Sequence, residues 1–72
     1  MEVRLFATLR ENREKIQYIN CREGMDGFVL LSELGISPEE VAIFLINGMH
    51  SRPDVALKQD DIIAIFPPVG GG

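Results

Sequence analysis

The chain has 72 residues and a formal net charge of −4 at pH 7, which is enough for one small domain and too little for a deep catalytic cavity. The acidic balance argues against nucleic acid as a partner, because that binding requires basic side chains that neutralise phosphates. A single cysteine excludes an internal disulfide, and no apolar run approaches the roughly 20 residues of a membrane helix. We therefore expect a cytoplasmic protein that has no membrane partner.

The first expected element is a strand over residues 2–9, where apolar and polar side chains alternate with the period of a half-buried strand. Phe6 is the exception, because this aromatic residue falls on the face that is otherwise polar. The buried face would carry Val3, Leu5, Ala7 and Leu9.

After a charged connection, residues 15–21 predict a second strand, the hairpin partner of the first. Two orientations fit this strand, in which the inward side chains are either Gln17, Ile19 and Cys21 or Ile16 and Tyr18. We favour the first orientation, which makes Cys21 a small buried hydrophobe rather than a reactive thiol.

Asp26 is a favourable N-cap for a helix over residues 27–34, and Gly35 stands where the left-handed residue after a helix belongs. Ile36 can then fold back on the helix. Gly27 weakens the helix by up to ~1 kcal/mol relative to alanine, so the helix depends on its packing. The buried stripe would consist of Leu30, Leu31 and Leu34, with help from Phe28.

Ser37-Pro38 predicts the start of one helical turn. The following run, residues 41–46, is apolar on both faces and is typical of a central strand that is covered on part of both sides. Asn47-Gly48 predicts a tight turn into a short edge strand over residues 49–51.

The last expected strand covers residues 62–66, with Ile63 and Ile65 facing the core and Phe66 facing outward. One sheet with the helix laid across it would bury the helix stripe. With the helix as a crossover, the first and last strands can lie side by side at the centre. Phe6 and Phe66 would then be neighbours on the open face, which is typical of a docking surface.

Basic side chains are concentrated near the start of the chain, because residues 1–22 hold five of the seven. Such polarity is commonly a solvated surface, and it can also steer a partner that carries an opposite patch. The five basic residues are Arg4, Arg10, Arg13, Lys15 and Arg22.

The sequence ends on Pro67-Pro68-Val69 and three glycines, Gly70 to Gly72. Two prolines end a strand ladder, and glycine loses more conformational freedom on ordering than any other residue. We therefore expect a domain over residues 1–69 and a flexible tail over residues 70–72. One interpretation of the tail is a frayed terminus. The functional interpretation is that the terminal carboxylate of Gly72 is a reactive group, carried on an arm narrow enough to enter a partner's channel.

Four segments, distributed along the chain from residue 3 to residue 72, carry a resemblance. They are VRLFATLR at residues 3–10, LLSELGI at 30–36, ING at 46–48 and IAIFPPVGGG at 63–72. In these segments the sequence resembles the MoaD/ThiS family, which includes the small subunit of molybdopterin synthase and the thiazole sulfur carrier. The resemblance implies an α+β fold, a ubiquitin-like β-grasp whose four- to five-stranded mixed sheet has one main helix packed across one face.

The resemblance also implies a carrier protein rather than an enzyme. An E1-like adenylyltransferase would use ATP and Mg²⁺ to join the C-terminal glycine to AMP, and a persulfide sulfur would displace the AMP to leave a thiocarboxylate. The carrier itself would bind no cofactor, because the partner supplies ATP and metal. In this scheme Gly72 carries the sulfur, and Gly70 and Gly71 thread the partner's channel. The residues that match the family's partner-binding face are Phe6, Arg10, His50 and Phe66.

The resemblance also implies a sulfur donor protein and a sulfur acceptor. The acceptor would be either the large subunit of molybdopterin synthase, in molybdopterin or tungstopterin synthesis, or thiazole synthase. Two alternatives stay open, a ubiquitin-like modifier conjugated to lysines and a plain β-grasp interaction module with an inert tail. No metal site is expected, since His50 and Cys21 alone do not supply the ligands of a zinc site.

The sequence departs from the family pattern at three places. A third terminal glycine leaves two candidates for the reactive end, Gly72 and Gly71. Asp60 occupies a corner where relatives commonly have glycine, and aspartate tolerates a positive φ better than most residues. Gly27 stands where an apolar helix residue is common.

Overall fold

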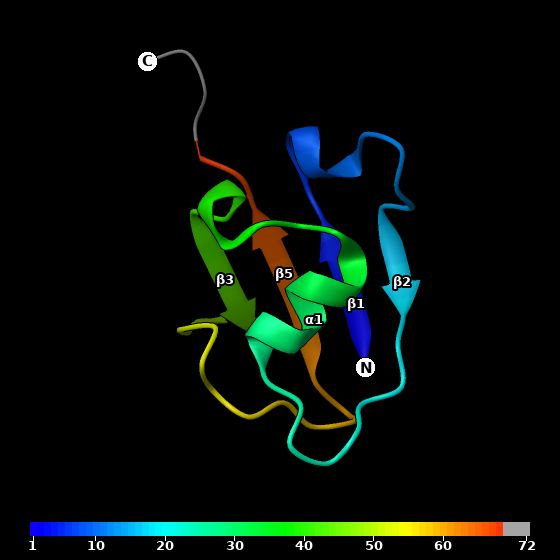
Figure 1. The fold of residues 1–72 in the computed structure, drawn as a ribbon, viewed down its shortest axis with the longest axis vertical. Coiled ribbons are helices and arrows are strands. Elements are labelled where there is room, and N and C mark those ends of the chain that lie inside the picture. The colour runs from blue at the N-terminus through cyan, green and yellow to red at the C-terminus, as the bar shows by residue number, and fades with distance from the viewer. Residues whose placement is uncertain (69–72) are drawn as a thin grey trace.

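The structure is a computed structural model that describes residues 1–68. Within these residues five strands form one mixed sheet in the order β2-β1-β5-β3-β4, and α1 lies across one face of it (Figure 1). This arrangement confirms the predicted α+β fold. The elements are β1 (Glu2–Leu5), the 3₁₀ turn η1 (Ala7–Arg10), β2 (Ile16–Tyr18), α1 (Gly27–Leu34), the 3₁₀ turn η2 (Pro38–Glu40), β3 (Ile43–Ile46), β4 (Met49–His50) and β5 (Ile62–Phe66).

The centre of the sheet is β5, which lies between β1 and β3. It runs parallel to β1, with Ile63 opposite Val3 and Ile65 opposite Leu5, so the predicted neighbourhood of the first and last strands is confirmed. These four side chains have no exposed surface. Together with Leu30 and Leu31 of α1 they form the centre of the core, between the helix and the sheet.

The apolar run that includes β3 lies inside the sheet but not at its centre. β3 pairs with β5 on one side and with the two-residue β4 on the other. Phe44 is buried in the core, whereas Ile43 is 36% exposed on the other face. The run is therefore apolar on both faces because one face meets the core and the other belongs to an apolar surface.

The ends of α1 are formed as the sequence predicts. The Asp26 carboxylate accepts a hydrogen bond of 2.9 Å from the Val29 N–H. Gly35 has a φ of 74°, and the Ile36 N–H donates to the Leu31 carbonyl at 2.9 Å, which completes a Schellman-type stop. The expected contribution of Phe28 is wrong: its ring is 45% exposed, because it lies on the side of the helix that faces away from the sheet.

Gly27 has a structural reason that helix propensity does not reveal. A Cβ at this position would lie 2.6 Å from the carbonyl oxygen of Pro53 and 3.0 Å from the Phe44 ring. Glycine is therefore required by the close approach of the Pro53 backbone to the first turn of α1. This packing explains why a weak helix former occupies position 27.

The first two strands are shorter than predicted. β1 ends at Leu5, where the sequence predicts a strand to residue 9. Ala7 adopts a positive φ of 54° and is exposed rather than buried, because the chain turns there into η1. Leu9 is nonetheless buried, since η1 folds this side chain back over the end of the core.

β2 covers residues 16–18 of the predicted 15–21. The favoured orientation of this strand is confirmed, because Ile16 and Tyr18 are 44% and 77% exposed while Ile19 and Cys21 pack against the core. The Cys21 thiol is half-buried and lies 3.2 Å from the Leu57 carbonyl oxygen.

The tight turn at Asn47-Gly48 is confirmed, with φ of 52° and 81° at the two residues. The Asn47 side chain links this turn to the corner before β5, because its amide donates to Asp61 at 2.9 Å and its oxygen accepts from the Ile62 N–H at 2.9 Å. Asp61 is only 7% exposed. Asp60 does not adopt a positive φ, so this corner makes no special demand on that residue.

Candidate partner-docking site

Phe6 and Phe66 form an aromatic stack at the end of the sheet. Their ring centroids lie 4.2 Å apart and their planes are inclined by 8°. Phe66 is the last residue of β5 and directly precedes Pro67 and Pro68. The predicted neighbourhood of the two aromatic residues is therefore confirmed, although each ring is half-buried because it covers the other.

Arg10 completes this cluster from the other side of Phe6. Its guanidinium carbon lies 5.2 Å from the centroid of the Phe6 ring, a distance that suits a cation–π contact. Its Nε donates to the Leu5 carbonyl at 2.8 Å. The structure thus brings together three of the four residues that the sequence assigned to the partner-binding face.

The turn at Ala7 positions this cluster. The Phe6 N–H donates to the Ile65 carbonyl at 3.2 Å, and the Phe6 carbonyl accepts from the Leu9 N–H at 3.2 Å. The backbone of Phe6 is therefore bonded to both β5 and η1. The positive φ of Ala7 reverses the chain at this point. As a result Arg10, which a continued strand would have carried away, returns above Phe6.

The sheet face opposite α1, here called the open face, continues the aromatic cluster as an apolar surface. Cross-strand pairing places Phe66 beside Ile43 on this face. Exposed apolar side chains on one face of a small protein are typical of an interaction site, although Glu2 and Arg4 on β1 separate the apolar side chains of β2 from those of β5 on this face. Its most exposed apolar members are Ile16 and Tyr18 on β2, Ile62 on β5 and Ile43 on β3.

His50 lies on the open face but far from the aromatic cluster. It is paired with Leu45 on β3, which in turn is paired with Ala64 on β5 and through it with Arg4 on β1. Three steps of about 4.8 Å between strands separate β4 from β1, or roughly 14 Å. If His50 belongs to the same candidate docking surface, it lies at the edge of that surface opposite to the aromatic cluster.

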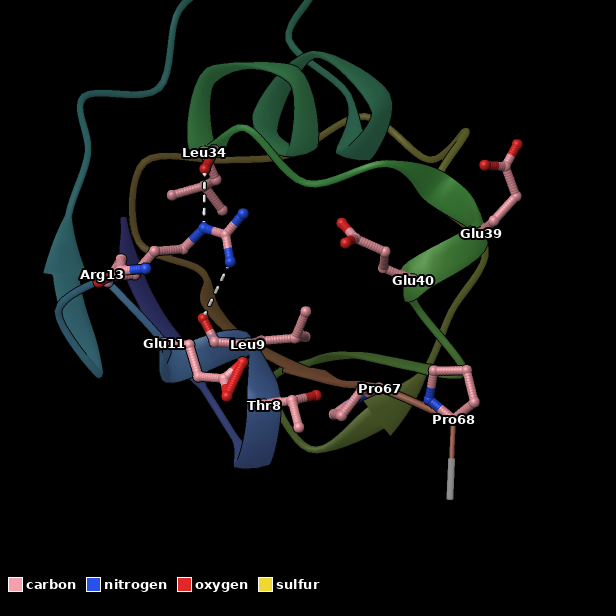
Figure 2. Close-up of a pocket in the computed structure, with 10 residues that line it drawn as sticks. Thr8, Leu9, Glu11, Arg13, Leu34, Glu39, Glu40, Pro67 and Pro68 are labelled. Atoms are coloured by element: carbon pink, nitrogen blue, oxygen red, sulfur yellow. Dashed lines mark hydrogen bonds between the residues drawn. The ribbon is translucent and has the colours of Figure 1, made fainter. Parts of the chain in front are cut away.

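A cavity of about 750 Å³ lies beside Pro67 and Pro68, on the other side of the chain's end from the open face. Figure 2 shows Arg13 reaching across its wall, with Nε donating to Leu34 at 3.1 Å and Nη1 to Leu9 at 3.3 Å. These bonds tie the connection after η1 to the end of α1. The cavity therefore has a fixed wall next to the point where the last described residues leave the sheet.

Sequence reasoning missed this cavity, because its lining comes from segments that are distant in the chain. The signal that could have indicated it is a set of acidic residues in or next to the two 3₁₀ turns, namely Glu11 directly after η1 and Glu39 and Glu40 within η2. Of these, Glu40 accepts a hydrogen bond of 2.9 Å from the Ser37 N–H. The cavity has an excess of negative charge, since Arg13 is the only basic residue among the residues of 1–68 that line it.

The predicted reactive end, Gly72, and the predicted tail residues Gly70 and Gly71 lie outside the described residues. The predicted domain boundary at residue 69 lies outside them too. Within residues 1–68 no group of three or more histidine, cysteine, aspartate or glutamate side chains is placed to hold a metal ion. In the same residues no helix has the length and apolar character to cross a membrane.

A five-stranded mixed sheet with parallel β1 and β5 at its middle and one helix across one face defines a ubiquitin-like β-grasp protein. The ThiS family model matches residues 3–72, and the chain therefore belongs to the ThiS family. Small ubiquitin-like proteins of this kind are sulfur carriers or modifiers, are generally not enzymes, and act with E1-like activating partners.

The structure is similar to the crystal structure of SAMP1 from Haloferax volcanii. The TM-score is 0.74 and the sequence identity is 26%, over 100% of this chain and 98% of that chain. None of the curated proteins matches this chain. The likeness to SAMP1 confirms the ubiquitin-like fold.

Proposed function

We propose that this chain is a cytoplasmic sulfur carrier whose C-terminal glycine, Gly72, is adenylated by an E1-like enzyme and converted to a thiocarboxylate. The observation that carries the proposal is that the ThiS family match runs through the final glycines. The stack of Phe6 and Phe66 supports it, because this stack lies directly before the segment that would enter the partner's active site.

The chemistry requires little from the carrier itself. An oxygen of the Gly72 carboxylate attacks the α-phosphorus of ATP, and pyrophosphate leaves. The terminal sulfur of a persulfide then attacks the acyl carbon, and the C–O bond to AMP breaks. The new bond is carbon–sulfur, and the sulfur–sulfur bond of the persulfide is still intact. A thiol finally attacks the donor's sulfur and breaks that sulfur–sulfur bond, which leaves the thiocarboxylate on the carrier and a disulfide on the donor. The partner provides ATP, Mg²⁺ and the catalytic groups, and the carrier provides the carboxylate and a docking surface.

In this proposal the folded surface, rather than the three glycines, would provide most of the affinity for the partner. Residues without side chains add almost no binding energy of their own, so a partner must gain affinity from a folded surface near the arm. The aromatic cluster of Phe6, Arg10 and Phe66 is placed for that role, with His50 at the far rim of the open face.

Alkylation followed by mass spectrometry tests the proposal. The Cys21→Ser variant has no thiol. After incubation with the E1-like enzyme of the same organism, ATP, Mg²⁺ and a persulfide donor, a thiocarboxylate would therefore be the sulfur nucleophile on this chain that iodoacetamide can label. We expect labelling on the C-terminal peptide that depends on ATP. Its absence, with the activating enzyme shown to be active by pyrophosphate release, would contradict the proposal.

Truncation distinguishes the two candidate reactive ends. A chain that ends at Gly71 should be labelled as well as the full chain if Gly72 is trimmed before activation, and should lose labelling if Gly72 itself bears the sulfur. A chain that lacks residues 70–72 is the negative control, and the inert-tail alternative predicts that it behaves like the full chain in the cell.

Conjugation to proteins is the second candidate function, which the likeness to SAMP1, another ubiquitin-like protein, favours. An acyl adenylate is an electrophile for a lysine amine as well as for sulfur. Lys58 is the last basic residue of the chain, so this function predicts that tryptic digests of the source organism contain lysines that carry residues 59–72 of this chain. Deletion of the gene should remove these modified lysines.

The sulfur acceptor would be the large subunit of molybdopterin synthase, in molybdopterin or tungstopterin synthesis, or thiazole synthase. The thiocarboxylate form of the chain, incubated with each purified acceptor and its substrate, should lose its sulfur with only one of them.

A further inference from the structure

A second, smaller cavity lies on the open face and is surrounded by positive charge. Its volume is about 250 Å³, and it lies between the chain after β1 and the start of β2. Its walls consist of three basic residues and three apolar ones. They are Arg4, Arg10 and Lys15, with Leu5, Phe6 and Ile16.

The basic groups around this cavity keep most of their hydrogen-bonding capacity. Arg4 and Arg10 each use only Nε within residues 1–68, for Glu2 and for the Leu5 carbonyl. The Lys15 ammonium forms no ion pair with another described residue. Arg13 differs, because its Nε, Nη1 and Nη2 all donate to backbone carbonyls.

One carboxylate on the protein does not neutralise three cations. The contact between Arg4 and Glu2 is an exposed ion pair, with 47% of the Arg4 side chain accessible, and exposed pairs of this kind are weak. Like charges around one cavity repel one another, so an anion that enters it relieves that repulsion and receives several charge-assisted hydrogen bonds.

We propose that this basic cavity binds the carboxylate of an acidic side chain on the E1-like partner while Phe6 and Phe66 contact an apolar part of the same partner. The inference rests on the proposed function for the identity of the partner. The cavity shares Phe6 with the aromatic cluster, so the two contacts belong to one continuous surface. Its apolar walls suit the aliphatic stem of a glutamate side chain.

A peptide carboxylate fits this cavity better than a polyanion such as nucleic acid. The chain as a whole carries a net charge of −4, and the other cavity near Pro67 is lined by Glu11, Glu39 and Glu40. A long polyanion that followed the surface from the basic cavity would meet this acidic wall. A single acidic side chain would not.

Titration followed by NMR tests the cavity without an activating enzyme. The probe is a capped tetraglutamate peptide, added to the ¹⁵N-labelled full chain at low salt, with backbone amides and arginine Nε–H signals observed. We expect saturable shifts at Arg4, Arg10 and Lys15. The double variant R4Q/K15Q should bind the peptide about tenfold more weakly. R52Q/K58Q removes the same charge far from the cavity, and it should bind within about twofold of the unchanged protein.

Several outcomes would overturn the inference. They are the absence of saturable shifts, equal weakening in R4Q/K15Q and R52Q/K58Q, and tighter binding of inorganic phosphate or a single-stranded oligonucleotide than of the peptide. Because the titration uses no ATP and no sulfur donor, it can succeed or fail independently of thiocarboxylate formation.

The partner itself provides the last test. In adenylation assays with the E1-like enzyme of the same organism, R4E/K15E should raise the KM for the carrier by about tenfold or more and leave kcat unchanged, because the reacting carboxylate is untouched. An unchanged KM would show that the partner does not use the cavity. A circular dichroism spectrum equal to that of the unchanged protein serves as the control for folding.

Discussion

Phe6 and Phe66 stack with parallel rings, 4.2 Å between centroids, and so join the end of β1 to the end of β5 at the position where the chain leaves the sheet. Because offset aromatic pairs contribute about 1 kcal/mol beyond their burial, we expect Phe6→Leu and Phe66→Leu to be coupled. A double-mutant cycle in urea denaturation should give a coupling free energy of about 1 kcal/mol. Strict additivity would show that the stack contributes only buried area.

Phe66→Asp should separate docking from folding. The ring is half-buried on the open face, outside the core between α1 and the sheet, so we expect a folded protein with an unchanged far-UV spectrum. Affinity for the E1-like partner, measured by isothermal titration calorimetry, should fall by at least about tenfold, because a charge replaces an apolar anchor. Loss of the folded spectrum would show instead that Phe66 is part of the core.

Phe28→Asp is the matched control for this variant. It makes the same change at a ring that is 45% exposed on α1, on the other face of the protein, and it should leave the affinity unchanged. An equal loss of affinity in both variants would place the partner's contact elsewhere or reveal a general effect of added charge.

Gly27→Ala should destabilise the protein although alanine is the better helix former. The new Cβ would lie 2.6 Å from the Pro53 carbonyl oxygen, which is backbone and cannot rotate away. Overpacking of this kind costs about 1–3 kcal/mol, which exceeds the gain of up to about 1 kcal/mol in helix propensity. Urea denaturation measures the net effect, with Ser32→Ala on the exposed side of α1 as a control that should be neutral or stabilising. A more stable Gly27→Ala variant would contradict the close approach.

Local signals explain which elements could be predicted from the sequence. The start of the helix follows from Asp26, whose side chain caps the first turn, and its end follows from Gly35, whose positive φ ends the last turn. The facing of β5 follows from alternation. Both kinds of signal are contained in the segment itself, and both predictions are confirmed.

The misses depend on contacts between distant segments. Alternation continues through Leu9 in the sequence, yet β1 ends at Leu5 because Ala7 turns the chain, and alanine gives no sign of a positive φ. Likewise the sequence identifies Gly27 only as a weak helix former, and the reason for glycine there is its close approach to Pro53. Phe28 matches the spacing of the helix stripe only approximately and points to solvent.

The same difference applies to the candidate docking site, of which one part could be predicted from the sequence and the rest could not. Strand order was enough to predict the contact of Phe6 with Phe66, whereas the return of Arg10 over Phe6 depends on the turn at Ala7. Both cavities escaped prediction, because each combines side chains from separate segments with no common motif. The assigned roles of these residues in partner binding stay predictions.

Asp61→Ala should lower stability by about 1–3 kcal/mol, the cost of leaving buried donors without an acceptor. The carboxylate is 7% exposed and accepts 2.8 Å and 2.9 Å hydrogen bonds from the Lys58 N–H and the Asn47 amide. Its neighbour provides the control, since Asp60 is exposed and Asp60→Ala should change the free energy of unfolding by less than about 0.5 kcal/mol. Equal effects in the two variants would show that the corner is held by other contacts.

Ala7→Gly should stabilise the protein, which is the reverse of the usual effect of this substitution. Ala7 has a φ of 54°, a conformation that costs an L-residue roughly 1–2 kcal/mol and costs glycine little. Glycine loses about 0.5–1 kcal/mol more backbone entropy on folding than alanine, so a net gain of up to about 1 kcal/mol is expected in urea denaturation.

Ala42→Gly is the matched comparison, because Ala42 is also exposed but has no positive φ. There only the entropic cost of glycine applies, and the variant should be less stable. Because the left-handed turn carries Arg10 back over Phe6, Ala7→Gly should also leave the affinity for the E1-like partner intact, whereas Ala7→Val, which disfavours the turn through its β-branched side chain, should lower both stability and affinity. Greater stability with valine than with glycine would show that residue 7 does not adopt the left-handed conformation in solution.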